Sequence, residues 1–242
     1  AVGGDHRLPR GVTGGAPPIV WHPDYVAPLR PGHPFPMSKY GYLRAALEAR
    51  GLMEDWLAPA PLGVARIAAA HDWDYVERVV AGTLAPDEVR RIGLPATEAV
   101  ARRARLSAAG TLLAARIATE RGIALNMAGG SHHAGPGWGA GYCVFNDVAV
   151  AARALLEEGI VGRVLVVDLD VHQGDGTARI FEGESRVFTL SVHAAKNFPA
   201  RKAVSDLDLA LPDGTGDAAY LAILEDALAE ALERARPEMI FY

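Results

Sequence analysis

The chain has 242 residues, of which 50% are hydrophobic and 22% charged, and its formal net charge is −5. This composition fits a globular chain with a sizeable core, argues against wholesale disorder, and does not favour a nucleic-acid-binding protein. The single cysteine, Cys143, excludes an intramolecular disulfide framework, and we therefore expect a soluble cytoplasmic protein without a membrane segment.

The first 18 residues are rich in glycine and proline, and we expect them to form a flexible lead-in to a single domain over residues 19–242. Apolar residues at helical spacing, together with capping residues, predict helices in the first half of the chain. The elements expected there, in chain order, are a short strand over 19–21 and helices over 38–50, 72–80 and 97–121, the first beginning at Ser38 and the last at Thr97.

Strands and helices alternate in the second half of the chain. In chain order we expect a strand over 123–128, a helix over 146–158, strands over 163–170 and 186–193, a helix over 216–237 and a final strand over 238–242. This alternation predicts an α/β fold of three layers (α/β/α), in which a mostly parallel sheet is covered by helices on both faces. Because the last strand reaches the end of the chain at Tyr242, we expect the C-terminal part of the fold to be missing.

Three polar clusters follow predicted strands, at the strand ends where open α/β sheets gather their functional sites. The first cluster, GGSHHAGPGWGAGYCVFND, places His132 beside His133 among glycines that allow the backbone to wrap closely around a ligand. Adjacent side chains of an extended segment point in different directions, but a turn would bring both histidines to one site. The alternative interpretation is a surface turn with two solvated histidines.

The second cluster, VLVVDLDVHQGDGT, delivers Asp168, Asp170, His172 and Asp175 directly after an apolar run. Burying unpaired carboxylates is costly, so a compensating partner is expected at this strand end. In extended geometry Asp170 and His172 share a face, and a carboxylate next to an imidazole supplies two ligands of a divalent metal site. Helix caps and an Asp–His hydrogen bond are the alternative interpretation, which accounts for fewer of the four residues.

The remaining patterns have weaker interpretations. The third cluster, TLSVHAAKNFP, fits a solvated loop as well as the wall of a site. His22, His33 and His71 are expected to cap or solvate loops, and the arginines of VRRIGLPATEAVARRARL are expected to form a solvated face. Cys143 lies among bulky residues and is not favoured as a nucleophile.

Three segments together resemble the zinc-dependent histone deacetylase family, which includes acetylpolyamine amidohydrolases and acetoin-utilisation proteins: GGSHHAGPGWGAGYCVFNDVAVAA, VLVVDLDVHQGDGT and VFTLSVHAAKNFP. The resemblance covers most of residues 19–242 and implies an arginase/deacetylase-like fold. Many family members have a second histidine where this chain has Gln173. The segments DLDVHQGDG and GTLLAARIATERGIALN are most similar to class IV deacetylases and their bacterial relatives, whereas Asp175 is closer to other branches.

The resemblance implies a role for each matching residue. His132 and His133 would lie beside the attacking water, with His133 as the general base, and Asp168 and Asp175 would orient His132 and His133 respectively. The other implied roles are zinc ligands (Asp170, His172), a carbonyl near the substrate amide (Gly141), tunnel walls (Tyr142, Phe198) and a structural potassium ion held by carbonyls of Asp168, Asp170 and His172 together with Ser191 and Val192.

The implied activity is zinc-dependent removal of an acetyl or longer acyl group from a lysine side chain or a related amine, without nucleic acid or membrane binding. The family's third zinc ligand, an Asp, and its catalytic Tyr would follow the strand over 238–242, so we expect weak zinc binding and little activity if the protein ends at Tyr242. Alternatives are a non-catalytic or metal-deficient binding module and a deacetylase of acetylpolyamines or small metabolites. An arginase-like manganese hydrolase is disfavoured, because Gly174 stands where its binuclear site needs an Asp.

Overall fold

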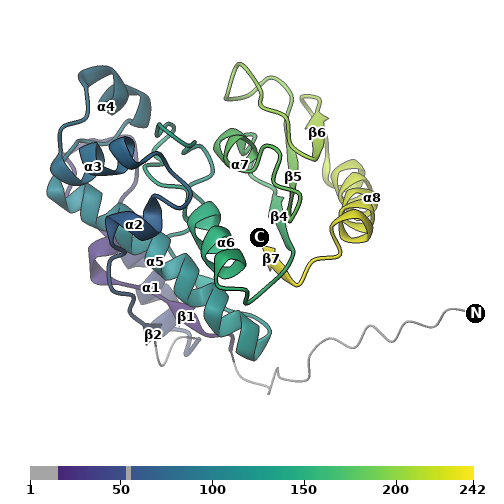
Figure 1. The fold of residues 1–242 in the computed structure, drawn as a ribbon, viewed down its shortest axis with the longest axis horizontal. Helices are drawn as coiled ribbons and strands as arrows, with labels where there is room; N and C mark the ends of the chain where they lie inside the picture. Colours follow the sequence, from purple (N-terminus) through teal and green to yellow (C-terminus); the bar gives the residue numbers. More distant parts are fainter. Residues whose placement is uncertain (1–15, 53–55) are drawn as a thin grey trace, which may run out of the picture.

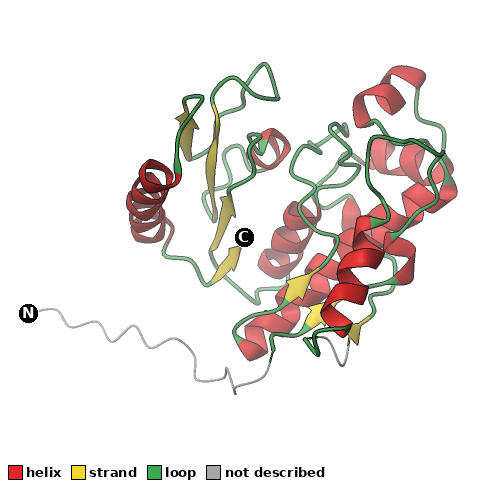
Figure 2. Ribbon diagram, turned by 180° about the vertical axis from the view of Figure 1, so that it is seen from behind, coloured by secondary structure: helices red, strands yellow, loops and turns green. Residues whose placement is uncertain are grey.

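The computed structural model describes residues 16–52 and 56–242, and its strands form two parallel sheets (Figure 1; Figure 2). Most of the predicted lead-in therefore lies outside the described residues. The first sheet has the strand order β2-β1-β3 and the second the order β6-β5-β4-β7. The strands are β1 (Ile19–Val20), β2 (Trp56–Leu57), β3 (Leu125–Asn126), β4 (Val164–Asp168), β5 (Val187–Ala194), β6 (Leu207–Leu211) and β7 (Met239–Phe241).

Helices α6 and α8 lie on opposite sides of the second sheet (Figure 1). The helices are η1 (Pro23–Tyr25, a 3-10 helix), α1 (Lys39–Glu48), α2 (Val64–Ile67), α3 (Trp73–Ala81), α4 (Pro86–Ile92), α5 (Glu98–Arg121), α6 (Asp147–Glu157), α7 (Asp175–Ile180) and α8 (Asp217–Ala235). None of the described helices is long and apolar enough to cross a membrane.

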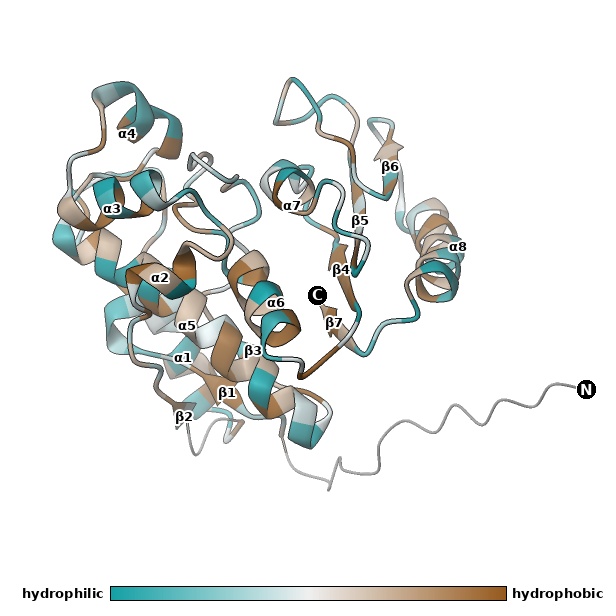
Figure 3. Ribbon diagram, viewed as in Figure 1, coloured by the Kyte–Doolittle hydropathy of each residue, from teal (hydrophilic) through white to brown (hydrophobic). Residues whose placement is uncertain are grey.

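The core follows the alternation of side chains along β4. Val164 and Val166 share a core cluster with the buried face of α6, whereas Leu165 and Val167 share one with α8. All four side chains are buried, which explains why this strand is an uninterrupted apolar run between the two helices (Figure 3). The expected α/β/α layering around a parallel sheet is therefore confirmed.

The helices expected to begin at Thr97 and at residue 146 are capped by these side chains, whereas the helix expected to begin at Ser38 is not. Thr97 Oγ1 accepts a hydrogen bond from the backbone of Val100, and Asn146 Oδ1 accepts one from Ala149, so α5 and α6 begin where the sequence predicts. Ser38 makes no such bond, because its backbone is already helical instead of extended. The short elements η1, α2, α4, β2 and β6 were not predicted from the sequence.

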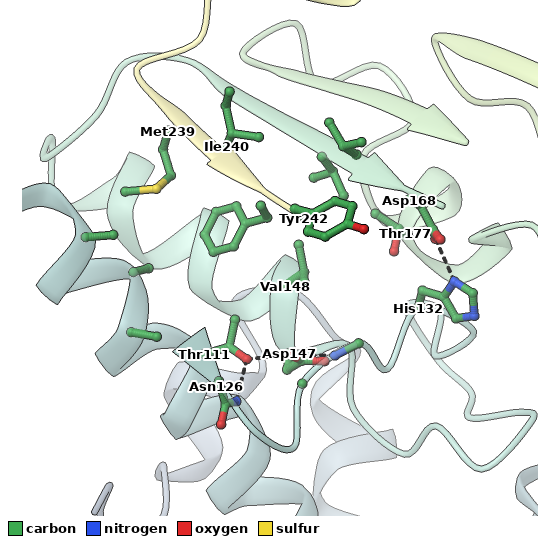
Figure 4. Close-up of a pocket in the computed structure, with 18 of the residues that line it drawn as sticks. Thr111, Asn126, His132, Asp147, Val148, Asp168, Thr177, Met239, Ile240 and Tyr242 are labelled. Carbon is green, nitrogen blue, oxygen red and sulfur yellow. Dashed lines mark hydrogen bonds and ion pairs between the residues drawn. The ribbon is translucent and has the colours of Figure 1, made fainter. Parts of the chain in front are cut away.

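A cavity of about 500 Å³ lies between the edge strands β3 and β7 (Figure 4). Val148 and Tyr242 contribute to its apolar part. At its polar end Asp147 is hydrogen-bonded to Thr111, and His132 is paired with Asp168. The loop that carries His132 therefore has this cavity on one side.

His71 is buried, so the expectation of a solvated loop histidine is wrong. Its Nδ1 lies 2.8 Å from the carbonyl oxygen of Gly135, and its Nε2 accepts a hydrogen bond of 2.9 Å from the backbone N–H of Asn146. The ring satisfies both partners only as the neutral tautomer with the proton on Nδ1. Burial lowers the pKa of His71 to about 4, although the hydrogen bond to Gly135 opposes this shift. By contrast, His22 and His33 accept local backbone hydrogen bonds, as expected.

We predict that His71 makes the protein less stable in acid. Between pH 6.5 and 4 the unfolded chain protonates this imidazole while the folded protein does not, so the free energy of unfolding falls as the pH falls, by about 3 kcal/mol in total. Urea unfolding in the presence of a chelator should show that His71→Gln, which does not titrate, loses less stability over this range than the parent protein. Parallel pH profiles of the two proteins would contradict the prediction.

Candidate active site

The polar clusters after β4 and β5 lie together because the two strands are parallel. Asp168 and Ser191 are partners at the end of the shared ladder, so the segments that follow leave the sheet at the same edge. The loop over 129–146, which carries the tandem histidines, approaches this edge from the other part of the chain. A backbone hydrogen bond joins this loop to α7, since the N–H of Thr177 donates to the carbonyl of His132.

Asp147, a residue not predicted from the sequence to have a role, fixes the start of this loop. Its fully buried carboxylate accepts hydrogen bonds from the backbone N–H groups of Gly130 (3.1 Å) and Ser131 (2.7 Å) and from the hydroxyl of Thr111. Three donors compensate the cost of burying the charge. Asp147 therefore sets the backbone position from which the two histidines project.

Each histidine of the tandem pair is bonded to its own aspartate. His132 Nδ1 lies 2.6 Å from Asp168 Oδ2, and His133 Nδ1 lies 2.7 Å from Asp175 Oδ1. The two rings lie 4.0 Å apart, so the loop turns both side chains to one site. With Nδ1 engaged by a carboxylate, each imidazole keeps Nε2 free for chemistry.

The carboxylates around His132 favour its protonated form. Burial by itself lowers the pKa of His132, but the hydrogen bond to Asp168 and the charges of Asp168, Asp170 and Asp175 outweigh burial and raise it. The pKa of Asp170 is lowered, because the backbone N–H of His172 and the charges of the two neighbouring imidazoles outweigh its partial burial. The site is thus strongly anionic around its imidazoles.

Asp170 and His172 do not lie on an extended strand, which corrects the geometry expected from the sequence. β4 ends at Asp168, whose Oδ1 accepts from the N–H of Asp170, and Asp170 Oδ1 in turn accepts from the N–H of His172. These two side-chain turns replace the strand ladder. They still bring the pair together, with Asp170 Oδ1 2.9 Å from His172 Nδ1.

The side chains at this edge can hold a divalent cation. The imidazoles of His132, His133 and His172 each offer a nitrogen, and these three atoms lie within 4.8 Å of one another. Asp170 adds a half-exposed carboxylate beside His172. Imidazole nitrogens with a carboxylate oxygen form a donor set that zinc accepts.

Two glycines allow the close packing of this site. Gly141 has a φ of +56°, and a Cβ there would lie 2.7 Å from His133 Cδ2. A Cβ on Gly174 would lie 2.2 Å from Asp168 Oδ2. Neither position has room for a side chain without displacing a His–Asp pair.

Aromatic side chains line the pocket in front of the histidines, a cavity of about 350 Å³. The ring of Phe198 stands perpendicular to that of His133, with centroids 4.8 Å apart. Tyr142 lines the same pocket, and its ring lies 5.0 Å from that of Phe35. The third polar cluster therefore contributes a wall of the site through Phe198, while Lys196 remains an exposed partner of Asp213.

Arg103 is buried beside this pocket, so the interpretation of its segment as a solvated face is wrong at this position. Its guanidinium donates to the carbonyl of Tyr25 (3.1 Å) and to the hydroxyl of Tyr40 (2.7 Å). Lys39 also lines the pocket, and burial together with the charge of Arg103 lowers its pKa. The same pocket is therefore lined by two cationic side chains, Lys39 and Arg103, and by the carboxylate of Asp170.

Cys143 is buried, and burial raises the pKa of its thiol to about 12, which agrees with the expectation that it is not a nucleophile. The potassium site stays a prediction. Among its expected residues, Ser191 and Asp168 are register partners, and Ser191 Oγ lies 3.0 Å from His193 Nδ1.

Comparison with known proteins relates most of the chain to one family. The family model of the histone deacetylase domain matches residues 33–242. The chain is 46% identical over 227 residues to an uncharacterised protein of Picosynechococcus sp., covering 93% of this chain and 76% of that protein. It is 30% identical over 222 residues to histone deacetylase 2 of Arabidopsis thaliana, covering 87% of this chain and 57% of the relative.

A probable deacetylase of Archaeoglobus fulgidus is 28% identical over 246 residues, covering 92% of this chain and 66% of that protein. The chain thus spans between about half and three quarters of these relatives. Among solved structures, the HDA15 HD domain superposes with a TM-score of 0.78 at 21% identity, over 92% of this chain and 72% of that one. At this identity the superposition shows a common fold.

Proposed function

Because the chain belongs to the histone deacetylase family, we propose that it is a zinc-dependent amidohydrolase that removes acetyl or longer acyl groups from lysine side chains or related amines. The observation that carries the proposal is the pair of His–Asp hydrogen bonds, His132 to Asp168 and His133 to Asp175, beside Asp170 and His172. Amide hydrolysis needs a group that moves protons and, next to it, an electrophilic centre. The paired histidines can move protons, and Asp170 and His172 can hold the electrophilic metal.

Asp170 and His172 are the proposed zinc ligands, and the fit rests on their paired oxygen and nitrogen donors 2.9 Å apart. When bound, zinc would polarise the acyl carbonyl and lower the pKa of a water toward about 7. The two turns that hold Asp170 and His172 keep both side chains at one end of β4. The neighbouring Gly174 leaves room for Asp168 beside them.

His133 is the proposed general base. Its hydrogen bond to Asp175 fixes the proton on Nδ1, so Nε2 takes a proton from the attacking water and passes it to the departing amine. The water oxygen bonds to the acyl carbon as the C–N bond breaks, and the products are the amine and the carboxylic acid, which at neutral pH become an ammonium ion and a carboxylate. The negative charge of Asp175 stabilises the transient imidazolium of His133. The imidazole of His132 is paired with Asp168 in the same way at the same site.

The acyl chain is proposed to lie between Tyr142 and Phe198, which line the pocket in front of His133. A wall of aromatic rings suits an aliphatic acyl chain, and the class IV likeness of the DLDVHQGDG segment favours acyl-lysine over polyamine substrates. Phe198 is 44% exposed, so this side of the pocket is open to the surface.

A substrate panel tests the proposal. Zinc-loaded protein is incubated with acetyl-lysine and long-chain acyl-lysine peptides and with acetylpolyamines, before and after chelation and zinc restoration. We expect the acyl-lysine peptides to be hydrolysed. Chelation should abolish this hydrolysis, and added zinc should restore it. Binding of acyl-lysine without turnover by zinc-loaded protein would instead favour a non-catalytic binding module, and turnover of acetylpolyamines alone would favour the small-amine alternative.

A further inference from the structure

We infer that Gln173 is a positioning residue that holds the loop over 195–206, and with it Phe198, against the tandem histidines. Its effect on acyl selectivity rests on the proposed function, whereas its effect on the loop does not. The side chain is 1% exposed, although its neighbours Val171 and His172 are partly open to solvent. A primary amide buried at such a position must find partners for its two N–H groups and its carbonyl.

All three polar functions of this amide are used, two on Ala203 of the loop and one on Asp208 of the adjoining strand β6. Gln173 Nε2 donates to the carbonyl of Ala203 (3.1 Å) and to Asp208 Oδ1 (2.8 Å), and Gln173 Oε1 accepts from the N–H of Ala203 (2.7 Å). Both backbone groups of Ala203 are therefore paired with one side chain, as they would be with a neighbouring strand. This clamp is specific for an amide, because neither a carboxylate nor an aliphatic side chain offers both donors and an acceptor.

Further contacts carry the clamp toward Phe198. The second oxygen of Asp208 accepts from the N–H of Ser205 (2.7 Å), so the clamp includes the end of the loop. Lys202, next to the clamped residue, donates its ammonium group to the carbonyls of Asn197 and Pro199. The tip of the loop is thus hydrogen-bonded to Lys202, the neighbour of Ala203.

Phe198 at this tip faces the proposed catalytic groups. Its ring lies 4.8 Å from that of His133 and 6.1 Å from that of His172. Because Gln173 directly follows His172, one short segment supplies a proposed zinc ligand and the anchor of the opposite wall. Releasing the anchor would move the wall and leave Asp170 and His172 in their turns, so the expected change is in substrate fit and not in zinc binding.

The test compares Gln173→Leu, Phe198→Ala and the double variant, all zinc-loaded, with Thr97→Ala as a control that removes the remote cap of α5. In Gln173→Leu we expect amide exchange in peptides from 195–206 to rise about tenfold or more, with zinc content unchanged. The ratio of kcat/KM for acetyl-lysine to that for a long-chain acyl-lysine should shift as it does in Phe198→Ala. The double variant should shift no further than Phe198→Ala alone.

Several outcomes overturn the inference. Unchanged exchange of 195–206 in Gln173→Leu, or the same rise in Thr97→Ala, would show that Gln173 does not hold this loop. Independent, additive shifts of selectivity would show that it does not act through Phe198. If Gln173→Leu does not fold, Asp208→Asn disturbs the same clamp from β6 and carries the same expectations. A parent protein that hydrolyses no acyl amine would refute the proposed function, while the exchange comparison still decides the role of Gln173.

Discussion

Replacing His133 by alanine is expected to lower kcat for acyl-lysine hydrolysis by about 10²- to 10⁴-fold, the range that a positioned acid–base group contributes. The ring is buried against Phe198 and bonded to Asp175, and alanine offers no group that can accept a proton in its place. Asp175→Asn keeps the size of the partner and loses only its charge, and we expect a smaller loss than in His133→Ala.

The comparison needs two controls. Zinc content must be the same in the parent and in His133→Ala, because a loss of metal would lower kcat for another reason. Thermal unfolding should show that the variant remains folded, since removal of a buried ring leaves a cavity. If zinc-loaded His133→Ala kept its kcat within about tenfold of the parent, the base would have to be a different group.

Local patterns predicted those parts of the fold that depend on neighbours in the sequence. The apolar run of β4 and the caps at Thr97 and Asn146 are local signals, and the structure agrees with them. β6 was missed although Leu207-Asp208-Leu209 alternates as a half-buried strand does, so its signal was present. The exposed and half-buried positions of β6 do alternate in the structure.

The interactions that could not be predicted join residues far apart in the chain. His71 is paired with Gly135 and Asn146, 64 and 75 residues away, and Arg103 reaches Tyr25 across 78 residues. No local pattern tells a buried histidine or arginine with such partners from a solvated one. The same holds for Gln173, whose amide is explained only by a loop 30 residues downstream.

The geometry at the end of β4 shows a second limit. Asp170 and His172 were predicted to share one strand face, whereas side-chain turns bring them together after the strand has ended. The residue types were informative because aspartates favour such turns as well as metal binding. Residue spacing alone did not distinguish a strand from two successive turns, although both bring the carboxylate to the imidazole.

Asp170→Ala and His172→Ala are expected to weaken zinc binding by more than the 10- to 100-fold that loss of an outer-shell partner typically costs, because each removes a proposed ligand. Zinc affinity is measured by competition with a chromophoric chelator, at a pH at which the imidazoles are neutral. His132→Ala is the matched variant, since it removes an imidazole of the same cluster that is not a proposed ligand.

The three variants distinguish two ways of holding the metal. If Asp170 and His172 bind zinc, His132→Ala retains most of the parent's zinc affinity and loses activity through the chemistry it supports. If the three imidazoles of His132, His133 and His172 bind zinc instead, His132→Ala loses zinc as severely as His172→Ala, and Asp170→Ala loses much less. The first result is expected, because the carboxylates around His132 raise its pKa and favour a charged imidazole, whereas a metal ligand must be neutral. Asp170 Oδ1 and His172 Nδ1, by contrast, lie 2.9 Å apart as a ready oxygen and nitrogen donor pair.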